Sequence, residues 1–105
     1  MPDVVPVEIF AALSDESRWE ILTKLGSEPA SASGLAAELP ISRQAIAKHL
    51  AVLTAAGLVT SSRAGREIRY EAVGAELSRI ARQLETIARG WDRRLAAIKS
   101  RAEEV

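Results

Sequence analysis

Polar side chains that can bind bases and phosphates cluster in one short segment of the chain. Ser42, Arg43, Gln44, Lys48 and His49 fall within eight residues, with apolar residues between them. Arginine can pair bidentately with guanine, and glutamine can pair with adenine. A serine hydroxyl and the free backbone N–H groups at a helix start suit a phosphate. The segment therefore has the chemistry to contact both base edges and the backbone of a nucleic acid.

A second basic group follows this segment. Arg63, Arg66 and Arg69 stand around a glycine in a stretch with strand-like alternation. Arginines in such a hairpin suit phosphates or an adjacent minor groove. We expect them to act together with the first group.

The overall charge hides this pattern. The 105 residues carry 14 basic and 14 acidic side chains, so the formal net charge is zero. Residues 1–41 carry −5, residues 42–73 carry +3 and residues 74–105 carry +2. A basic region on a neutral protein still attracts an anionic partner.

The composition excludes several classes of site. Without cysteine there is no disulfide, no thiolate zinc site and no thiol nucleophile. A single histidine and the lack of a glycine-rich phosphate loop leave no basis for an enzyme, so we expect no catalytic residue, no cofactor and no metal. The chain shows no secretory leader and no long apolar run, which favours a cytoplasmic protein without a membrane partner.

Three residues predict the starts of helices in the first half of the chain. Asp15, Ser31 and Ser42 are N-cap candidates, and a shorter helix is expected to begin near Pro6. The segment 27–30 is predicted to be a loop.

The helix that starts at Ser42 has the sharpest boundaries. Ile41 and Ile46 have the spacing of a hydrophobic staple. Leu50 and Leu53 continue the inward stripe, and Gly57 closes the helix. Its other face presents the basic and amide side chains.

The pattern changes after this helix. Two strand-like runs, 58–63 and 66–73, are joined by Ala64-Gly65 and predict a β-hairpin.

From residue 75 to 103 apolar residues recur at steps of three and four, although Gly90 could mark either a bend or a close approach. A helix of some 28 residues spans roughly 42 Å, which exceeds what a small domain can cover. A second copy of the chain is the simplest partner, and the predicted dimer residues are Phe10, Leu77, Ile80, Leu84, Ile87, Trp91, Leu95 and Ile98.

This order of elements is that of a winged helix-turn-helix, a mainly α fold with a small β-hairpin and a long C-terminal dimerisation helix. We expect one domain over residues 1–105. It comprises the helix-turn-helix at 32–56, the wing at 58–73 and the dimerisation helix at 75–103.

The sequence also resembles the ArsR/SmtB family of bacterial winged-helix repressors. The resemblance covers about residues 8–73, through Ala12–Arg18, Ile21-Leu22, Leu35-Ala36, Ile41–Leu50 and Ala56–Val59. The tail around Trp91-Asp92 and Arg94-Leu95 is similar to a metal-independent branch that includes autorepressors. The resemblance implies a homodimer built on the first and last helices and bound to an imperfect inverted repeat.

One departure from the family concerns metals. Well-known members sense metals or arsenicals through cysteines on the third helix or through His, Asp and Glu on the last. Here the third-helix stretch, 35–39, has no cysteine and the last helix has no histidine. We therefore expect no metal sensing.

The sequence thus predicts a DNA-binding transcriptional regulator, most simply a homodimeric repressor bound to double-stranded DNA. The alternatives are a winged helix that binds protein, or a repressor with a non-metal effector. The predicted DNA-binding residues are Ser42, Arg43, Gln44, Ala45, Lys48, His49, Arg63, Arg66 and Arg69. His49 could instead orient the helix through a hydrogen bond, and Arg18 is expected to form an intrachain ion pair.

Overall fold

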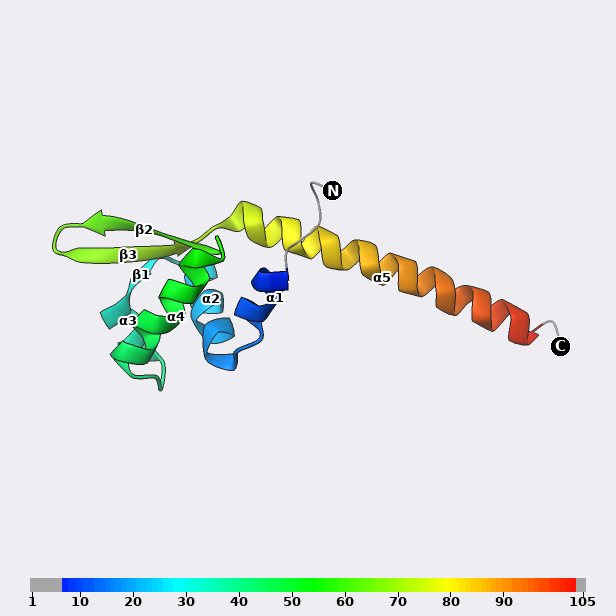
Figure 1. Ribbon diagram of the computed structural model, residues 1–105, viewed down its shortest axis with the longest axis horizontal. Coiled ribbons are helices and arrows are strands. Elements are labelled where there is room, and N and C mark those ends of the chain that lie inside the picture. The colour runs from blue at the N-terminus through cyan, green and yellow to red at the C-terminus, as the bar shows by residue number, and fades with distance from the viewer. Residues whose placement is uncertain (1–6, 104–105) are drawn as a thin grey trace.

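The computed structural model of the chain describes residues 7–103, so the expected role of Pro6 lies outside the described residues. The elements in chain order are α1 (Val7–Leu13), α2 (Glu16–Ser27), β1 (Ala30–Ser31), α3 (Ala32–Glu38), α4 (Arg43–Ala55), β2 (Val59–Ala64), β3 (Glu67–Ala72) and α5 (Gly74–Glu103). Figure 1 shows α1–α4 grouped beside the hairpin, while α5 leads away from them. The predicted winged helix-turn-helix with a long last helix is confirmed.

The predicted helix caps are also confirmed. The side-chain oxygens of Asp15, Ser31 and Ser42 each accept a hydrogen bond from the backbone N–H three residues further on, at 3.0, 3.1 and 3.2 Å. Each bond satisfies a donor that the first turn of a helix leaves without a partner. The residue types at these positions thus fix where α2, α3 and α4 begin.

The sheet contains one strand that the sequence did not predict. Its order is β1-β3-β2, all antiparallel, and Ala30 lies opposite Tyr70. We expected a loop up to Ala30, because a two-residue strand is too short to show alternation. The hairpin turn uses Gly65, whose φ of +66° lies in the left-handed region that glycine adopts most readily.

The core lies between α2, α3, α4 and the sheet. Its largest fully buried side chains are Ile21, Leu35, Ile46, Leu50, Leu53 and Leu58. Three of them form the predicted inward stripe of α4. Burial of this stripe leaves the opposite face of α4 turned to solvent.

The last helix is much longer than the core that it touches. It has 30 residues, a length of about 45 Å, and runs unbroken through Gly90. Of its side chains only Ile80 is buried, whereas a row of large apolar residues further along is exposed, namely Leu84, Ile87, Trp91, Leu95 and Ile98. We call this row the α5 stripe. Among the described residues no helix is long and apolar enough to cross a membrane.

Candidate nucleic-acid interface

The solvent face of α4 carries three of the predicted DNA-binding side chains. Arg43, Gln44 and Lys48 are exposed, and Ala47 is exposed between them. All four belong to the first two turns, the part of a recognition helix that reaches base edges. Ser42 is exposed as well, and although its oxygen caps the helix, its hydroxyl hydrogen is still free to donate.

Two other predicted residues of α4 lie at the edge of the core. Ala45 and His49 are half-buried and lie one helical turn apart, on the side of α4 where His49 contacts Arg18 of α2. The ring Nδ1 of His49 lies 3.5 Å from Nη1 of Arg18. Of the two hypotheses for His49, this contact supports the one in which the histidine orients the helix.

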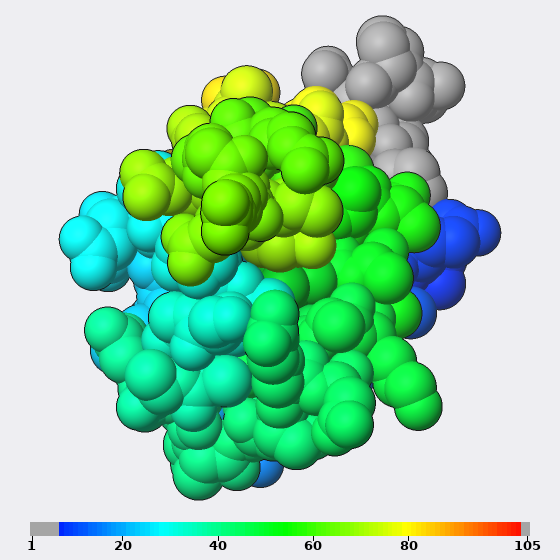
Figure 2. All heavy atoms as spheres, turned by 90° about the vertical axis from the view of Figure 1, so that its left-hand side faces the viewer, coloured from blue at the N-terminus to red at the C-terminus, as the bar shows by residue number. Residues whose placement is uncertain are grey.

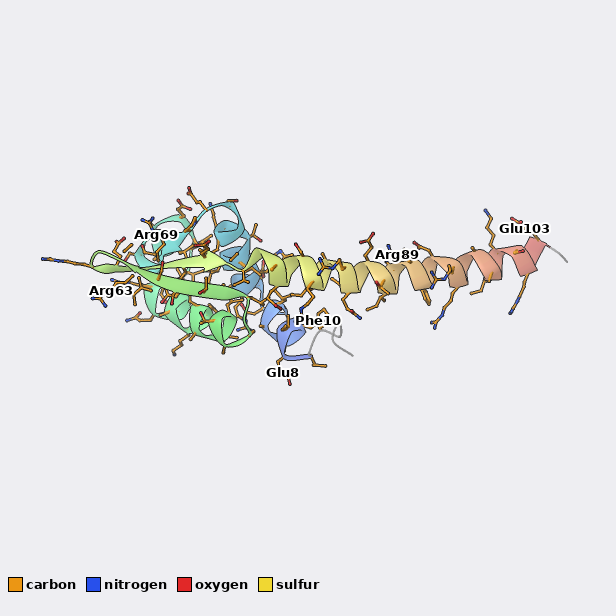
Figure 3. The ribbon with its side chains drawn as sticks, turned by 90° about the horizontal axis from the view of Figure 1, so that it is seen from above. Glu8, Phe10, Arg63, Arg69, Arg89 and Glu103 are labelled. Atoms are coloured by element: carbon orange, nitrogen blue, oxygen red, sulfur yellow. The ribbon has the colours of Figure 1, made fainter. Side chains whose placement is uncertain are left out.

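The strand register divides the three arginines of the wing between two faces. Arg63 lies opposite Ile68, so both project from the same face of the hairpin, whereas Arg69 lies opposite Ser62 on the other face. Figure 3 shows Arg63 and Arg69 on opposite sides of the hairpin. Arg66 follows Gly65 at the tip.

A groove between α3, α4 and the wing brings two of the predicted residues together. It has a volume of about 370 Å³, and its lining comprises Ser31, Ala32, Ser33, Arg43, Ala47, Arg66, Glu67, Ile68 and Tyr70. Figure 2 shows this side of the molecule, with the wing above α3 and α4. Arg43 and Arg66, 23 positions apart in the chain, therefore line one concave surface.

Arg69 lies elsewhere. It lines a different groove together with Lys24 and Glu38, which form an ion pair at 3.1 Å, and with Glu67. Arg69 is therefore separated from the groove that Arg43 and Arg66 line. Alternation along β3 was visible in the sequence, but which face meets α4 depends on how the sheet packs.

The structure adds residues that sequence analysis missed. Ser33, Ala47 and Tyr70 line the same groove as Arg43 and Arg66. Ala47 could have been found from the helical period, since it lies three residues after Gln44. Ser33 had no signal of its own, because its place follows from the packing of α3 against α4.

The basic side chains of this surface are available to an anion. Three ion pairs occur within residues 7–103, namely Lys24–Glu38, Arg79–Glu76 and Arg89–Glu85. None of these pairs uses a basic residue of α4 or of the wing. Because no described carboxylate pairs with them, Arg43, Lys48, Arg63 and Arg66 keep their charge for a partner.

Arg18 differs from expectation in its partners. Its Nε donates to the carbonyl oxygen of Ala12 at 2.7 Å, and it forms no ion pair among the described residues. Its backbone N–H donates to the carboxylate of Asp15, and this hydrogen bond, with help from the nearby Arg18 charge, lowers the pKa of Asp15 below its usual value.

Within the described chain, no cluster of three or more His, Cys, Asp or Glu side chains is placed to hold a metal ion.

Comparisons with known proteins agree with this fold. A family model described as a helix-turn-helix domain matches residues 13–62. The HTH-type transcriptional regulator Rv2034 of Mycobacterium tuberculosis is 34% identical over 90 residues, which are 86% of this chain and 81% of that protein.

Solved structures give the same result. An ArsR-like transcriptional regulator from Rhodococcus sp. RHA1 is 66% identical, with a TM-score of 0.77 over 90% of this chain and 89% of that one. NolR from Sinorhizobium fredii is 27% identical, with a TM-score of 0.66 over 77% of this chain and 81% of its own. The chain therefore belongs to the ArsR family of winged helix-turn-helix transcriptional regulators.

Proposed function

We propose that this regulator is a homodimeric repressor that binds an inverted-repeat operator without sensing a metal. The proposal rests on one surface, formed by the solvent face of α4 and by the face of the wing that carries Arg63 and Ile68. Its basic side chains are exposed and have no described acidic partner. A surface of this kind suits the phosphates and base edges of duplex DNA.

Each side chain of this surface has a proposed role. Arg43 and Gln44, at the start of α4, contact base edges in the major groove. The phosphates that flank these bases are contacted by three basic side chains, those of Lys48, Arg63 and Arg66. We give Arg69 a smaller part than these, because it projects from the opposite face of the hairpin.

The proposed dimer explains the exposed apolar surface. The α5 stripe is continuous with a groove of about 330 Å³ whose walls, Leu13, Leu22, Ile80 and Leu84 among them, are almost entirely apolar. A second copy of the chain would bury both features on each protomer at once, as a two-fold interface requires. The dimer would place two α4 helices about 34 Å apart, one turn of the DNA helix.

The proposal that the regulator senses no metal rests on which metal-binding side chains the chain has. The chain has no cysteine and a single histidine, and that histidine faces Arg18. Carboxylates alone make a poor site for Zn²⁺ or arsenite. Isothermal titration of the protein with Zn²⁺ and with arsenite should show no tight site, and one tight site per chain that released DNA would refute this part of the proposal.

The DNA-binding proposal can be tested with a duplex selected by the protein from a randomised pool. Fluorescence anisotropy should show tighter binding to the selected duplex than to a scrambled one. The logarithm of the affinity should fall steeply with the logarithm of the salt concentration, because each phosphate contact releases a counterion. Failure to select any duplex, or a flat salt dependence, would favour a winged helix that binds protein instead.

A further inference from the structure

Arg18 lies where three helices meet, outside the DNA-facing surface described above. Its Nε donates to the carbonyl oxygen of Ala12 at 2.7 Å, and its Nη2 donates to that of Ala11 at 3.4 Å. Both carbonyls belong to the last turn of α1, which leaves its carbonyl groups without partners inside the helix. The positive guanidinium therefore fixes the end of α1 against the start of α2.

The same guanidinium also reaches the recognition helix. Its Nη1 lies 3.5 Å from Nδ1 of His49, 31 residues further along the chain. Arginine can only donate hydrogen bonds, so Nδ1 must be the acceptor. A hydrogen bond between these two atoms therefore requires the neutral form of His49 in which Nε2 carries the proton.

We infer that Arg18 is a positioning residue for DNA binding, which holds α4 in its DNA-binding orientation through His49 and ties it to α1. The inference rests on the proposed function, since it concerns how the proposed DNA-binding helix is held. One side chain thus joins α1, which carries the proposed dimer residue Phe10, to α4, which carries the proposed base contacts.

Protonation of His49 would break this arrangement. A protonated ring has no acceptor, and its positive charge would stand 3.5 Å from the guanidinium. Asp15 also lies at the junction: its carboxylate accepts from the backbone N–H of Arg18, and its negative charge interacts with both Arg18 and His49. Glu8, the one charged residue of the described α1, lies towards the opposite end of that helix from the carbonyls bound by Arg18.

The direction of the pH effect separates the two hypotheses for His49. If His49 bound a phosphate, an added positive charge would strengthen DNA binding as the pH falls. If Arg18 positions α4 through the neutral ring, the same protonation weakens binding. Histidine is the side chain that ordinarily changes charge between pH 5 and 8.

The test compares four proteins on the duplex selected by the wild type, at pH 8 and at pH 5.5. Arg18→Met removes the donor, and His49→Asn keeps an acceptor that does not titrate. Arg79→Met is the matched control, because Arg79 pairs with Glu76 on α5 and makes no described contact with α4. Thermal melting and sedimentation confirm that each variant is folded and has the oligomeric state of the wild type.

We expect Arg18→Met to bind about three- to tenfold more weakly than wild type at pH 8, as the loss of its hydrogen bond to His49 predicts. The wild type should bind more weakly, not more tightly, at pH 5.5 than at pH 8, whereas the affinity of His49→Asn should depend less on pH. The NMR signal of the His49 Nδ1 atom should shift in Arg18→Met and keep its wild-type position in Arg79→Met.

Two results would overturn the inference while leaving the proposed function intact. One is tighter binding by the wild type at pH 5.5 than at pH 8, with His49→Asn insensitive to pH. The other is wild-type affinity in a folded Arg18→Met protein. Failure of the wild type to bind any selected duplex would instead refute the proposed function itself.

Discussion

Replacement of Trp91 by alanine should weaken self-association by about three orders of magnitude. Trp91 is 56% exposed in the single chain and lies in the middle of the α5 stripe. With about 250 Å² for a whole tryptophan side chain, the exposed part is about 140 Å². At about 25 cal/mol per Å², its burial in a dimer is worth at most about 3.5 kcal/mol per protomer.

The net effect is smaller than this limit, because alanine would still cover part of the area. We take about 2 kcal/mol per protomer, which two-fold symmetry doubles to about 4 kcal/mol for the dimer. A change of this size raises the dimer dissociation constant about a thousandfold. Sedimentation equilibrium over a range of protein concentrations measures that constant directly.

The matched control for this experiment is Arg89→Ala. Arg89 lies two residues before Trp91 but on the opposite side of α5, and it forms an ion pair with Glu85 at 3.3 Å in which both side chains are exposed. Pairs of this kind contribute little to stability. An unchanged dimer constant in Trp91→Ala, or an equal loss in Arg89→Ala, would contradict an interface formed by the α5 stripe.

Three further predictions concern the DNA contacts, the wing and the start of α2. In competition binding, Gln44→Ala should reduce the preference for particular bases, whereas Arg66→Ala should lower the affinity for all DNA sequences alike. Equal effects of the two changes would refute this division of roles. Chemical denaturation should show that Gly65→Ala lowers the free energy of unfolding by about 1 kcal/mol, because alanine is strained at a φ of +66°. Gly26→Ala in α2 should instead raise it by up to about 1 kcal/mol. A change of the same sign in both variants would be inconsistent with this account. Because the pKa of Asp15 is lowered in the folded chain, its ionised carboxylate stabilises the fold above the unfolded-state pKa of about 3.9. This stabilisation is lost as the pH falls through the folded-state pKa. Urea unfolding at pH 3 to 6 should therefore show the advantage of wild type over Asp15→Asn shrinking as the pH falls, and a constant difference would argue against it.

Local patterns predicted the elements of this fold well. The caps at Asp15, Ser31 and Ser42 and the inward stripe of α4 depend on neighbours within a few residues, so the sequence carries them directly. The length of the apolar pattern after residue 74 likewise predicted α5. The strand β1 escaped notice because its two residues form a strand only by pairing with Tyr70 and Arg69.

The candidate site was predictable in its residue types but less so in its geometry. The helical period indicates that Gln44 and Lys48 share a face, yet it does not show that Arg43 and Arg66 line one groove. The strand register places Arg63 and Arg69 on opposite faces of the hairpin, but which of these faces meets α4 depends on tertiary packing. The contact between Arg18 and His49 joins residues 31 positions apart, which no local pattern encodes.

Protection of guanine N7 from methylation on the selected duplex tests the central claim most directly, because that atom lies in the major groove where α4 is proposed to bind. We predict two protected clusters, related by the inverted repeat and about one helical turn apart, which Trp91→Ala weakens together and Arg89→Ala leaves unchanged. A bound duplex with no protected guanine, or with one isolated cluster, would contradict a dimer that places two α4 helices in successive major grooves.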